Sequence, residues 1–580
     1  MPHLKFEDVK ISYSTYEKGG RGVVEAVRGV TLDVPVGSTI GLAGASGCGK
    51  STLAMSVLRL LPSNAKIEGR IMLGDESIAD MKWGRLRAVR WTEASIVFQG
   101  AMHSLNPVQR IHDQIAEALV LHATGERKKY KETAEQDRRI AELMEQVDLP
   151  LSKAKQYPHE LSGGQKQRVM IALALACDPE IIIADEPTTA LDVIVQDQIL
   201  RLLKQLVRER GLSLIMISHD LSVLASTCER MVVMQAGQIV EQGPAIEVMT
   251  NPQHPHTQEL AAAFPTIGDW SSRLSLPSYT APDAPGPGGP GSKPLPDPAE
   301  VSVTPTTMLS LRDAVVAARN LTVTFGSGDR AFTAVNDVNL TCRPGEIIAL
   351  VGQSGSGKTT LARTVLGLQA PTSGELMYRG KPLPKKRKDL KAYRRRVQFV
   401  LQDPSAALNP KQSVFEAVAE GPRLHNMPGD EREIIAQALT DAELTPPEKY
   451  FQAIPQELSG GQRQRVVIAG ALALGPEFLL ADEPVASLDA SVRAGVLALF
   501  LRLRSEKGLG ALVITHDLGL AWNIADRVAV MYRGEIVEHG TVEEVLLEPQ
   551  HEYTRHLLSV VPSRELREAG VQNSDGSSAP

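Results

Sequence analysis

Residues 44–52 read GASGCGKST, and residues 352–360 read GQSGSGKTT. Both stretches match the pattern G-x-x-x-x-G-K-[ST], which forms a loop whose backbone N–H groups hold the phosphates of a nucleotide. Glycine is needed there because the N–H groups must approach phosphate oxygens closely, in conformations that a Cβ atom would block. A glycine-rich turn without a ligand is the alternative for one such loop alone. Because both loops precede the same series of motifs, we expect two nucleotide sites on one chain.

Each phosphate loop supplies a lysine and a hydroxyl group. Lys50 and Lys358 would place a positive charge against the terminal phosphates. The hydroxyl groups of Ser51 and Thr359 suit Mg²⁺, which prefers oxygen ligands. The expected nucleotide-binding residues of the two loops are Gly44, Ala45, Ser46, Gly47, Cys48, Gly49, Lys50, Ser51 and Thr52, and Gly352, Gln353, Ser354, Gly355, Ser356, Gly357, Lys358, Thr359 and Thr360.

The two loops differ at one position, where Cys48 stands in the first and Ser356 in the second. A thiol near a helix N-terminus and a lysine is expected to react readily with maleimide, with ATP protecting it. The alternative is that Cys48 is a small buried side chain that does not react.

An Asp-Glu pair follows an apolar run in each half, at Asp185-Glu186 and at Asp482-Glu483. Ligand sites of α/β proteins open at the carboxyl ends of strands. The aspartate would hold Mg²⁺ through water, and the glutamate would polarise an attacking water as a general base. A solvated strand exit or a helix cap is the alternative for either pair alone.

The sequence LSGGQ occurs at residues 161–165 and again at residues 458–462. A serine and two glycines that open a helix offer a hydroxyl group and free N–H groups to an anion. A plain helix N-cap is the alternative. The candidate binding residues are Ser162, Gly163, Gly164 and Gln165, and Ser459, Gly460, Gly461 and Gln462.

The two halves are a duplication. In the rear part of each half, matching motifs lie 297 residues apart: Ser162 and Ser459, Asp185 and Asp482, His219 and His516, and His254 and His551. In the front part the spacing varies, with 308 residues between the loop lysines and 303 between Gln99 and Gln402. Because loops vary in length while cores keep their register, the rear motifs are expected on a common scaffold.

Short apolar segments alternate with helical stretches in both halves. Residues 39–43 and 347–351 are expected strands that lead into the phosphate loops, with helices from Leu53 and Leu361 onward. Continuous apolar runs are typical of strands buried on both faces of a sheet. They occur at residues 181–184, 214–217, 478–481 and 512–514. The pattern predicts an α/β fold with a mainly parallel sheet in each half and a small antiparallel lobe at its front.

Residues 265–305, between the halves, contain ten prolines, with GPGGP at residues 286–290. Such a segment cannot bury a core, and we expect a flexible or partly extended linker that reaches roughly 35 Å. The predicted organisation is a nucleotide-binding domain at 1–264, a linker at 265–310, a second nucleotide-binding domain at 311–569 and a disordered tail at 570–580.

The composition argues against several classes of protein. The formal net charge is −6 over 580 residues, so no global basic field points to nucleic acid. The four cysteines form no C-x-x-C pair, which argues against a structural zinc site and fits a reducing compartment. Neither a signal peptide nor a run of about 18 apolar residues is expected, so any membrane work would require other chains. The basic run at residues 385–396 is interpreted as a solvated helix face or as a contact with anionic lipid or an acidic partner.

The LSGGQ segments, in this order of motifs, resemble the signature of the ABC ATPase superfamily, and the resemblance covers residues 4–264 and 315–560. It implies two tandem P-loop NTPase domains, each with a mainly parallel sheet, an antiparallel β lobe and a helical lobe. It also implies a head-to-tail sandwich, in which each ATP lies between the phosphate loop of one domain and the signature of the other. One site would use Lys50, Ser51, Gln99, Asp185, Glu186 and His219 with Ser459, Gly460 and Gly461. The other would use Lys358, Thr359, Gln402, Asp482, Glu483 and His516 with Ser162, Gly163 and Gly164.

The resemblance assigns roles to single residues. Gln99 and Gln402 match the Q-loop, which senses the γ-phosphate and contacts the transmembrane partner. They join the expected Mg²⁺ ligands Ser51, Asp185, Thr359 and Asp482. His219 and His516 match the switch histidine, for which a satisfied structural histidine is the alternative.

Two further pairs follow from the same resemblance. Asp192 and Asp489 match the D-loop that communicates between the sites. Tyr13 and Phe325 lie where the family stacks an aromatic ring on adenine; an ordinary strand aromatic, or Tyr16 in place of Tyr13, is the alternative.

Two further segments resemble the peptide/nickel importer ATPases within that superfamily. Leu-Asn-Pro follows each Q-loop glutamine, at residues 105–107 and 408–410. His-Pro-His-Thr at 254–257 and His-Glu-Tyr-Thr at 551–554 are similar to the HPYT ending of that branch, each with one difference. Gln99 is followed by Gly-Ala where the branch has Asp-Pro. Several relatives carry a cysteine cluster beyond this ending, and because none follows Pro265 here we expect no iron–sulfur cluster.

The resemblance therefore implies an ATPase subunit of a binding-protein-dependent importer at the cytoplasmic face of the cell membrane. It would bind ATP and Mg²⁺, act on two transmembrane permease subunits, and serve an extracytoplasmic solute-binding protein indirectly. A tandem ABC protein that acts on ribosomes, or an exporter ATPase, is the alternative. The Pro-Gly linker argues against the ribosomal alternative, whose members join their domains by a long charged helix.

Overall fold

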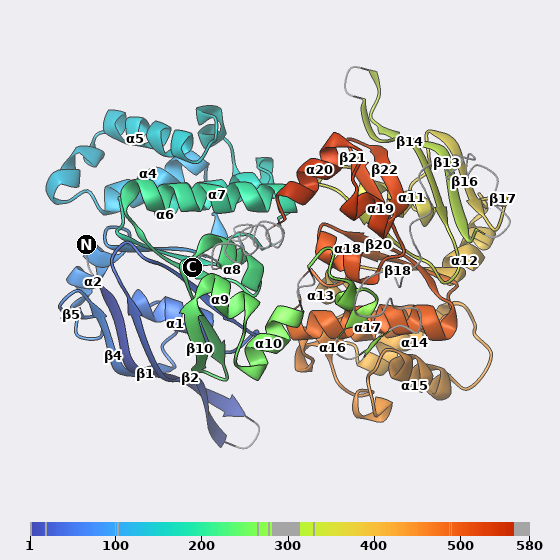
Figure 1. The fold of residues 1–580 in the computed structure, drawn as a ribbon, viewed down its shortest axis with the longest axis horizontal. Helices are drawn as coiled ribbons and strands as arrows, with labels where there is room; N and C mark the ends of the chain where they lie inside the picture. Colours follow the sequence, from blue (N-terminus) through green and yellow to red (C-terminus); the bar gives the residue numbers. More distant parts are fainter. Residues whose placement is uncertain are drawn as a thin grey trace, which may run out of the picture. The chain divides into compact units, whose positions relative to one another are not determined.

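The computed structural model describes residues 3–17, 20–98, 100, 104–189, 191–263, 266–276, 279–280, 314–328, 331–486, 488 and 490–561. It divides into two compact units, of which the first ends at Ala261 and the second begins at Ala262. Each unit contains a six-stranded sheet and a four-stranded sheet (Figure 1).

The six-stranded sheet of the first unit has the order β10-β9-β3-β8-β7-β6. All neighbours are parallel except β10, which runs antiparallel to β9. Every residue of β3, β7 and β8 is buried, which confirms the expectation from their continuous apolar runs. The strands are β3 (Thr39–Gly44), β6 (Ala94–Val97), β7 (Ile181–Asp185), β8 (Ser213–Ile217), β9 (Arg230–Gln235) and β10 (Gln238–Pro244).

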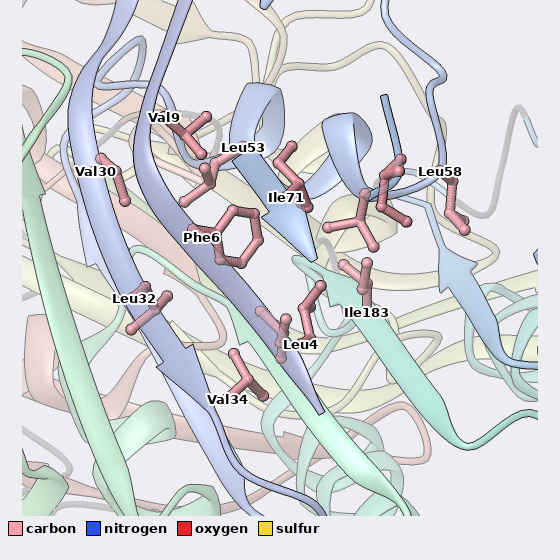
Figure 2. Packing of buried hydrophobic residues seen from close by; sticks show 14 of the residues in the cluster. Leu4, Phe6, Val9, Val30, Leu32, Val34, Leu53, Leu58, Ile71 and Ile183 are labelled. Atoms are coloured by element: carbon pink, nitrogen blue, oxygen red, sulfur yellow. The ribbon is translucent and has the colours of Figure 1, made fainter. Parts of the chain in front are cut away.

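The four-stranded sheet of the first unit is antiparallel and has the order β2-β1-β4-β5. Its inner face packs on the helix that follows the phosphate loop, α1 (Lys50–Val57). Figure 2 shows this core, where Phe6 of β1 lies close to Leu53 of α1. The sheet therefore helps to fix the position of α1, the helix that the phosphate loop enters. Its strands are β1 (Leu4–Glu17), β2 (Gly20–Val34), β4 (Ala65–Leu73) and β5 (Glu76–Ser77).

A helical lobe completes the first unit, built from α4 (Ile111–Leu121), α5 (Thr133–Gln146) and α6 (Gly163–Ala174). The LSGGQ motif opens α6, so the signature lies on this lobe and the phosphate loop on the sheet. The remaining helices are α2 (Trp83–Val89), α7 (Val193–Arg210), α8 (Leu221–Thr227), α9 (Ala245–Thr250) and α10 (Pro255–Ala262).

The second unit repeats this architecture. Its six-stranded sheet has the order β18-β19-β20-β15-β21-β22, and its antiparallel sheet has the order β14-β13-β16-β17. The strands are β13 (Val316–Phe325), β14 (Phe332–Cys342), β15 (Ile347–Val351), β16 (Ser373–Tyr378), β17 (Lys381–Pro382), β18 (Val397–Val400), β19 (Phe478–Asp482), β20 (Gly510–Thr515), β21 (Arg527–Tyr532) and β22 (Glu535–Thr541). The helices are α11 (Lys358–Val365), α12 (Arg387–Arg396), α13 (Pro404–Ala407), α14 (Val414–Leu424), α15 (Glu431–Asp441), α16 (Gly460–Leu472), α17 (Ala490–Lys507), α18 (Leu518–Ile524), α19 (Val542–Leu547) and α20 (Glu552–Ser559).

The predicted fold class is confirmed in both units, with two small differences. The helices after the phosphate loops begin at Lys50 and Lys358, earlier than the expected Leu53 and Leu361. Within the described ranges, no helix is both long and apolar enough to cross a membrane.

The predicted start of the linker, residue 265, is too early, because the residues that follow it are folded. Residues 266–276 form a turn of 3₁₀-helix (Trp270–Ser272) and the strand β11 (Ser275–Leu276), which pairs with β12 (Tyr279–Thr280). They belong to the second unit, where Leu274 and Leu276 are buried. The expectation of an unpacked segment was wrong for these residues because their apolar side chains find a surface on α17 and α18. Residues 281–310 of the expected linker and the expected tail at 570–580 lie outside the described residues.

Candidate functional site

Each phosphate loop holds its lysine by the loop's own carbonyl groups. Lys50 Nζ donates to the carbonyl oxygens of Gly44 at 2.7 Å and Ala45 at 2.8 Å. Lys358 Nζ donates in the same way to the carbonyl oxygens of Gly352 and Gln353, both at 2.7 Å. The ammonium groups thus lie across the inside of each loop, where a phosphate group would meet them.

The last glycine of each loop is required by its surroundings. Gly49 has φ 105° and Gly357 has φ 108°, in the left-handed region that favours glycine. A Cβ atom on Gly49 would lie 2.3 Å from the carbonyl oxygen of Ala26, and one on Gly357 would lie 2.2 Å from that of Ala334. The loop therefore turns into its helix only with glycine at this position.

Cys48 lies inside its loop and is 5% exposed. Its Sγ atom accepts a hydrogen bond from Lys50 Nζ at 3.5 Å. Ser356 fills the same place in the second loop and accepts from Lys358 Nζ at 3.4 Å. The expectation of an accessible thiol is not supported, because a side chain at this position points inward beneath the lysine.

An aspartate and a hydroxyl group meet at the end of the buried strand in each unit. Thr359 Oγ1 donates to Asp482 Oδ2 at 3.1 Å, and the Ser51 hydroxyl group acts on the Asp185 carboxyl group in the first unit. Burial raises the pKa of both aspartates, and the hydroxyl hydrogen bonds oppose that shift. Asp185 Oδ1 is buried without a hydrogen-bond partner. An unpaired carboxylate oxygen beside a hydroxyl group is a donor set that suits Mg²⁺.

No group of three or more His, Cys, Asp or Glu side chains that could hold a metal ion occurs among the described residues.

The glutamate that follows each aspartate contacts the predicted switch histidine. Glu186 Oε1 lies 3.5 Å from His219 Nδ1, and Glu483 Oε1 lies 3.0 Å from His516 Nδ1. Both glutamates have φ 46°, an uncommon value for a residue with a side chain. The structure thus brings together the two residues that the sequence predicted as general base and switch.

The ionisation of the two glutamates follows from these contacts. Burial alone would raise the pKa of Glu186, but the hydrogen bond and charge of His219, with smaller contributions from Thr189 and Lys50, lower it to about 2. Burial likewise raises the pKa of Glu483, but the hydrogen bond and charge of His516 lower it, and the pKa of Glu483 is lowered overall. Both carboxylates are therefore ionised at neutral pH, as a proton acceptor must be.

The two glutamates differ in their remaining partners. Gln402 Nε2 donates to Glu483 Oε2 at 2.8 Å, which places this predicted Q-loop residue in the second site. Gln99 lies outside the described residues. Thr189 Oγ1 donates to Glu186 Oε2 at 2.9 Å, and the second unit has Ala486 at that place. Thr189 does not belong to any motif recognised in the sequence, although the constant spacing of 297 residues aligns it with Ala486 and so reveals this difference between the units.

Each signature serine caps the helix that it opens. Ser162 Oγ accepts from the N–H of Gln165, and Gln165 Oε1 accepts from the N–H of Ser162. Ser459 and Gln462 form the same capping box at α16. Both serines remain exposed. The helix N-cap that the sequence left as an alternative is therefore present, and it still leaves the start of each helix open to an anion.

The D-loop and aromatic candidates have mixed outcomes. Asp192 is buried and caps α7 by accepting from the N–H of Val195 at 3.0 Å, whereas Asp489 lies outside the described residues. Tyr13 donates from its hydroxyl group to Thr52 Oγ1 of the phosphate loop at 3.3 Å. Phe325 ends β13 and is 42% exposed. The side chain of Tyr16 lies outside the description.

The HPYT-like ending of the second unit reaches the phosphate loop, a contact that the sequence analysis missed. The Tyr553 hydroxyl group accepts from the N–H of Gln353 at 3.0 Å, and its ring stacks on Tyr532 at 4.2 Å between centroids. His256 has the matching place in the first unit; it is 8% exposed, and neither ring nitrogen makes a hydrogen bond.

Part of the basic run at residues 385–396 makes hydrogen bonds within the second unit. Arg394 donates to the carbonyl oxygens of Leu366 and Gly367, and Lys391 donates to that of Leu424. These side chains cap helix ends, a role that the sequence analysis did not weigh.

Comparison with known proteins assigns the chain to a family. The model of the ABC transporter family matches residues 27–189 and 335–486. The model of the oligopeptide/dipeptide transporter C-terminal region matches residues 240–287 and 537–578, which contain the two HPYT-like endings.

Curated relatives match nearly the whole chain. The glutathione import ATP-binding protein GsiA of Escherichia coli (strain K12) is 38% identical over 562 residues, which cover 93% of this chain and 87% of that protein. The protein of the same name from Shigella dysenteriae serotype 1 is 38% identical over 569 residues, with the same coverage. A solved dimer of the ATP-binding cassette MJ0796, bound to ADP and Pi, is 31% identical and covers 39% of this chain and 98% of that chain, with a TM-score of 0.36. The matches to both duplicated segments and to full-length relatives show that the chain belongs to the ABC transporter family of ATP-binding proteins, as an ATPase coupled to transport.

Proposed function

We propose that the chain is the ATP-hydrolysing subunit of a binding-protein-dependent importer for peptides or a related small solute, such as a dipeptide, an oligopeptide, glutathione or a nickel complex. The observation that carries this proposal is the paired C-terminal region, present in both units and named for oligopeptide and dipeptide transporters. The relatives named for glutathione import, which match 93% of this chain, support it further.

The residues present fit an Mg²⁺–ATP complex in each unit. Lys50 and Lys358 would hold the terminal phosphates, and the ion would supply positive charge that neutralises the phosphates. Its protein ligands would be Ser51, Asp185 and Gln99 in one site, and Thr359, Asp482 and Gln402 in the other. The orphaned Asp185 Oδ1 atom supports this assignment.

The glutamates would act as general bases. An ionised Glu186 or Glu483 can accept a proton from the attacking water, and His219 or His516 keeps the carboxylate in place through Nδ1. The complete sites would require both units, each phosphate loop facing the exposed signature serine of the other unit in a head-to-tail sandwich, with Asp192 and Asp489 between the sites. Tyr13 and Phe325 would stack on adenine.

The partners would be two transmembrane permease subunits at the cytoplasmic face of the cell membrane, and an extracytoplasmic solute-binding protein would act through them. No nucleic acid and no iron–sulfur cluster is part of this proposal. Solute selectivity would reside in the permeases and the binding protein.

An uptake assay in the source cells tests the proposal. Deletion of the coding sequence should abolish uptake of at least one radiolabelled solute among glutathione, dipeptides, oligopeptides and nickel. The wild-type chain should restore that uptake, and a chain with both Glu186→Gln and Glu483→Gln should not. Unchanged uptake of all four, with ATP-dependent sedimentation of the chain with ribosomes, would instead favour the ribosomal alternative.

A further inference from the structure

Residues 266–276 and 279–280 form a strap, and it lies on a surface of the second unit made by α17 and α18 (Figure 1). The centre of this surface is Trp522 of α18, which is fully buried. Trp270 of the strap meets the Trp522 ring edge to face, with 5.2 Å between centroids at 73°. Leu274 and Leu276 are 5% and 7% exposed. The strap therefore packs on α17 and α18 through apolar side chains that are as buried as those of a protein interior.

Polar groups fix the register of this contact. Trp522 Nε1 donates to the carbonyl oxygen of Asp269 at 3.0 Å. Asn523 Nδ2 donates to the carbonyl oxygens of Ser272 and Ser275, and the Asn523 carbonyl oxygen accepts from the N–H of Leu274 at 2.8 Å. Asn523 thus makes hydrogen bonds with three backbone groups of the strap. All three can form only when the strap lies in this register on α18.

An ion pair closes the end of the contact. Arg273 of the strap is 4% exposed, and its Nε lies 3.1 Å from Glu543 Oε1 of α19. Its guanidinium group also lies over the Trp522 ring, at 5.9 Å from the centroid. A cation this well buried is held by both the carboxylate and the ring face.

The duplication provides an internal comparison. In the 297-residue register, the first unit has Ala225 where the second has Trp522, Ser226 for Asn523 and Ile246 for Glu543. Ile246 is 43% exposed. The large ring, the amide and the carboxylate that receive the strap therefore exist in the second unit alone, although the helices that carry them exist in both.

We propose that the strap is a built-in docking peptide that fastens the second ATPase unit to the end of the first, independently of the peptide chain that joins them. The partner of the receptor surface (Trp522, Asn523 and Glu543) is this segment of the same chain. Because α18 follows directly on His516 and Asp517, the strap also bears on the helix behind the switch histidine. The units would remain attached through the movements of a catalytic cycle.

Cleavage of the full-length chain tests this proposal. A site for a sequence-specific protease is inserted after Ser292, so that the strap stays with the first fragment and its receptor with the second. After cleavage in EDTA without nucleotide, size-exclusion chromatography should show one species with the mass of the uncut chain. The combined strap variant Trp270→Ala and Arg273→Ala should separate into two fragments after the same cleavage. Asn523→Ala should separate in the same way, whereas Ser226→Ala, the matched change in the first unit, should leave the cut chain as one species.

A synthetic peptide of residues 264–282 provides a second measurement that needs no variant to fold. An excess of this peptide should displace the strap and separate the cut wild-type fragments, whereas a peptide with Trp270→Ala and Arg273→Ala should not. Separation of the cut wild-type chain without peptide, or retention of one species by the strap variant, would overturn the proposal.

Discussion

Tyr553→Phe removes one hydroxyl group from the second unit and leaves the aromatic ring in place. That hydroxyl group accepts the N–H of Gln353, the second residue of the phosphate loop, at 3.0 Å. The remaining phenyl ring would keep the stacking contact with Tyr532, and Tyr553 is 8% exposed, so the fold should tolerate the change. The substitution therefore removes a hydrogen bond that fixes the phosphate loop before ATP binds.

The size of the effect follows from the partly buried hydrogen bond. A typical bond of this kind contributes about 0.5–1.5 kcal/mol net. Without this hydrogen bond, part of the free energy of ATP binding would be used to order the phosphate loop. Because about 1.4 kcal/mol corresponds to tenfold, the KM for ATP should rise by about two- to twelve-fold. The kcat should change little, because Glu483, His516 and Gln402 are not touched.

Steady-state ATPase assays over a range of ATP concentrations separate these two parameters. His256→Phe is the matched control, because His256 holds the same position in the first unit and its ring nitrogens make no hydrogen bond. The control should leave KM unchanged. An unchanged KM in Tyr553→Phe, or an equal rise in His256→Phe, would refute the inference that the C-terminal segment anchors the phosphate loop.

Two further predictions concern the catalytic glutamates, and a third concerns Cys48. Glu186→Gln and Glu483→Gln, assayed separately, should each remove the general base of one site and so lower the turnover of the chain by about half or more; an unaffected rate in either would contradict the assignment of two active sites. The pKa of Glu186 is lowered to about 2, so its ionisation stabilises the folded state above about pH 4.5 and this stabilisation is lost as the pH falls towards 2. In urea titrations the free energy of unfolding of the wild type should therefore fall more steeply than that of Glu186→Gln over this range, by up to about 3 kcal/mol, and parallel curves would contradict this. Mass spectrometry after maleimide treatment should find Cys48 unmodified in the folded chain, because it is 5% exposed; labelling that ATP prevents would restore the reactive-thiol interpretation.

Much of the fold could be predicted because local sequence and tertiary structure agree. The apolar runs at 181–184 and 478–481 are strands buried on both faces, as their composition indicated. The constant register of 297 residues placed the second Asp-Glu pair and switch histidine once the first were recognised. In each unit this glutamate lies beside this histidine, and the roles of both residues stay predictions.

The remaining features depend on tertiary contacts that no local pattern contains. The proline content of residues 265–305 led to the prediction of an unfolded linker, although Trp270, Leu274 and Leu276 lie within it. These residues fold because they pack on a surface that lies more than two hundred residues later in the chain. The Thr189–Glu186 hydrogen bond lies in the loop after β7, where Glu186 has a positive φ angle. The burial of Cys48 and its contact with Lys50 depend on how the phosphate loop folds.

The central claim is that one chain carries two competent ATP sites. In the combined variant Glu186→Gln and Glu483→Gln, slow hydrolysis should leave bound ATP intact, so that its amount reports the number of sites. Equilibrium dialysis of the full-length variant with radiolabelled ATP and Mg²⁺ measures this number directly. The account predicts two ATP molecules per chain at saturation, and a value of one would contradict it.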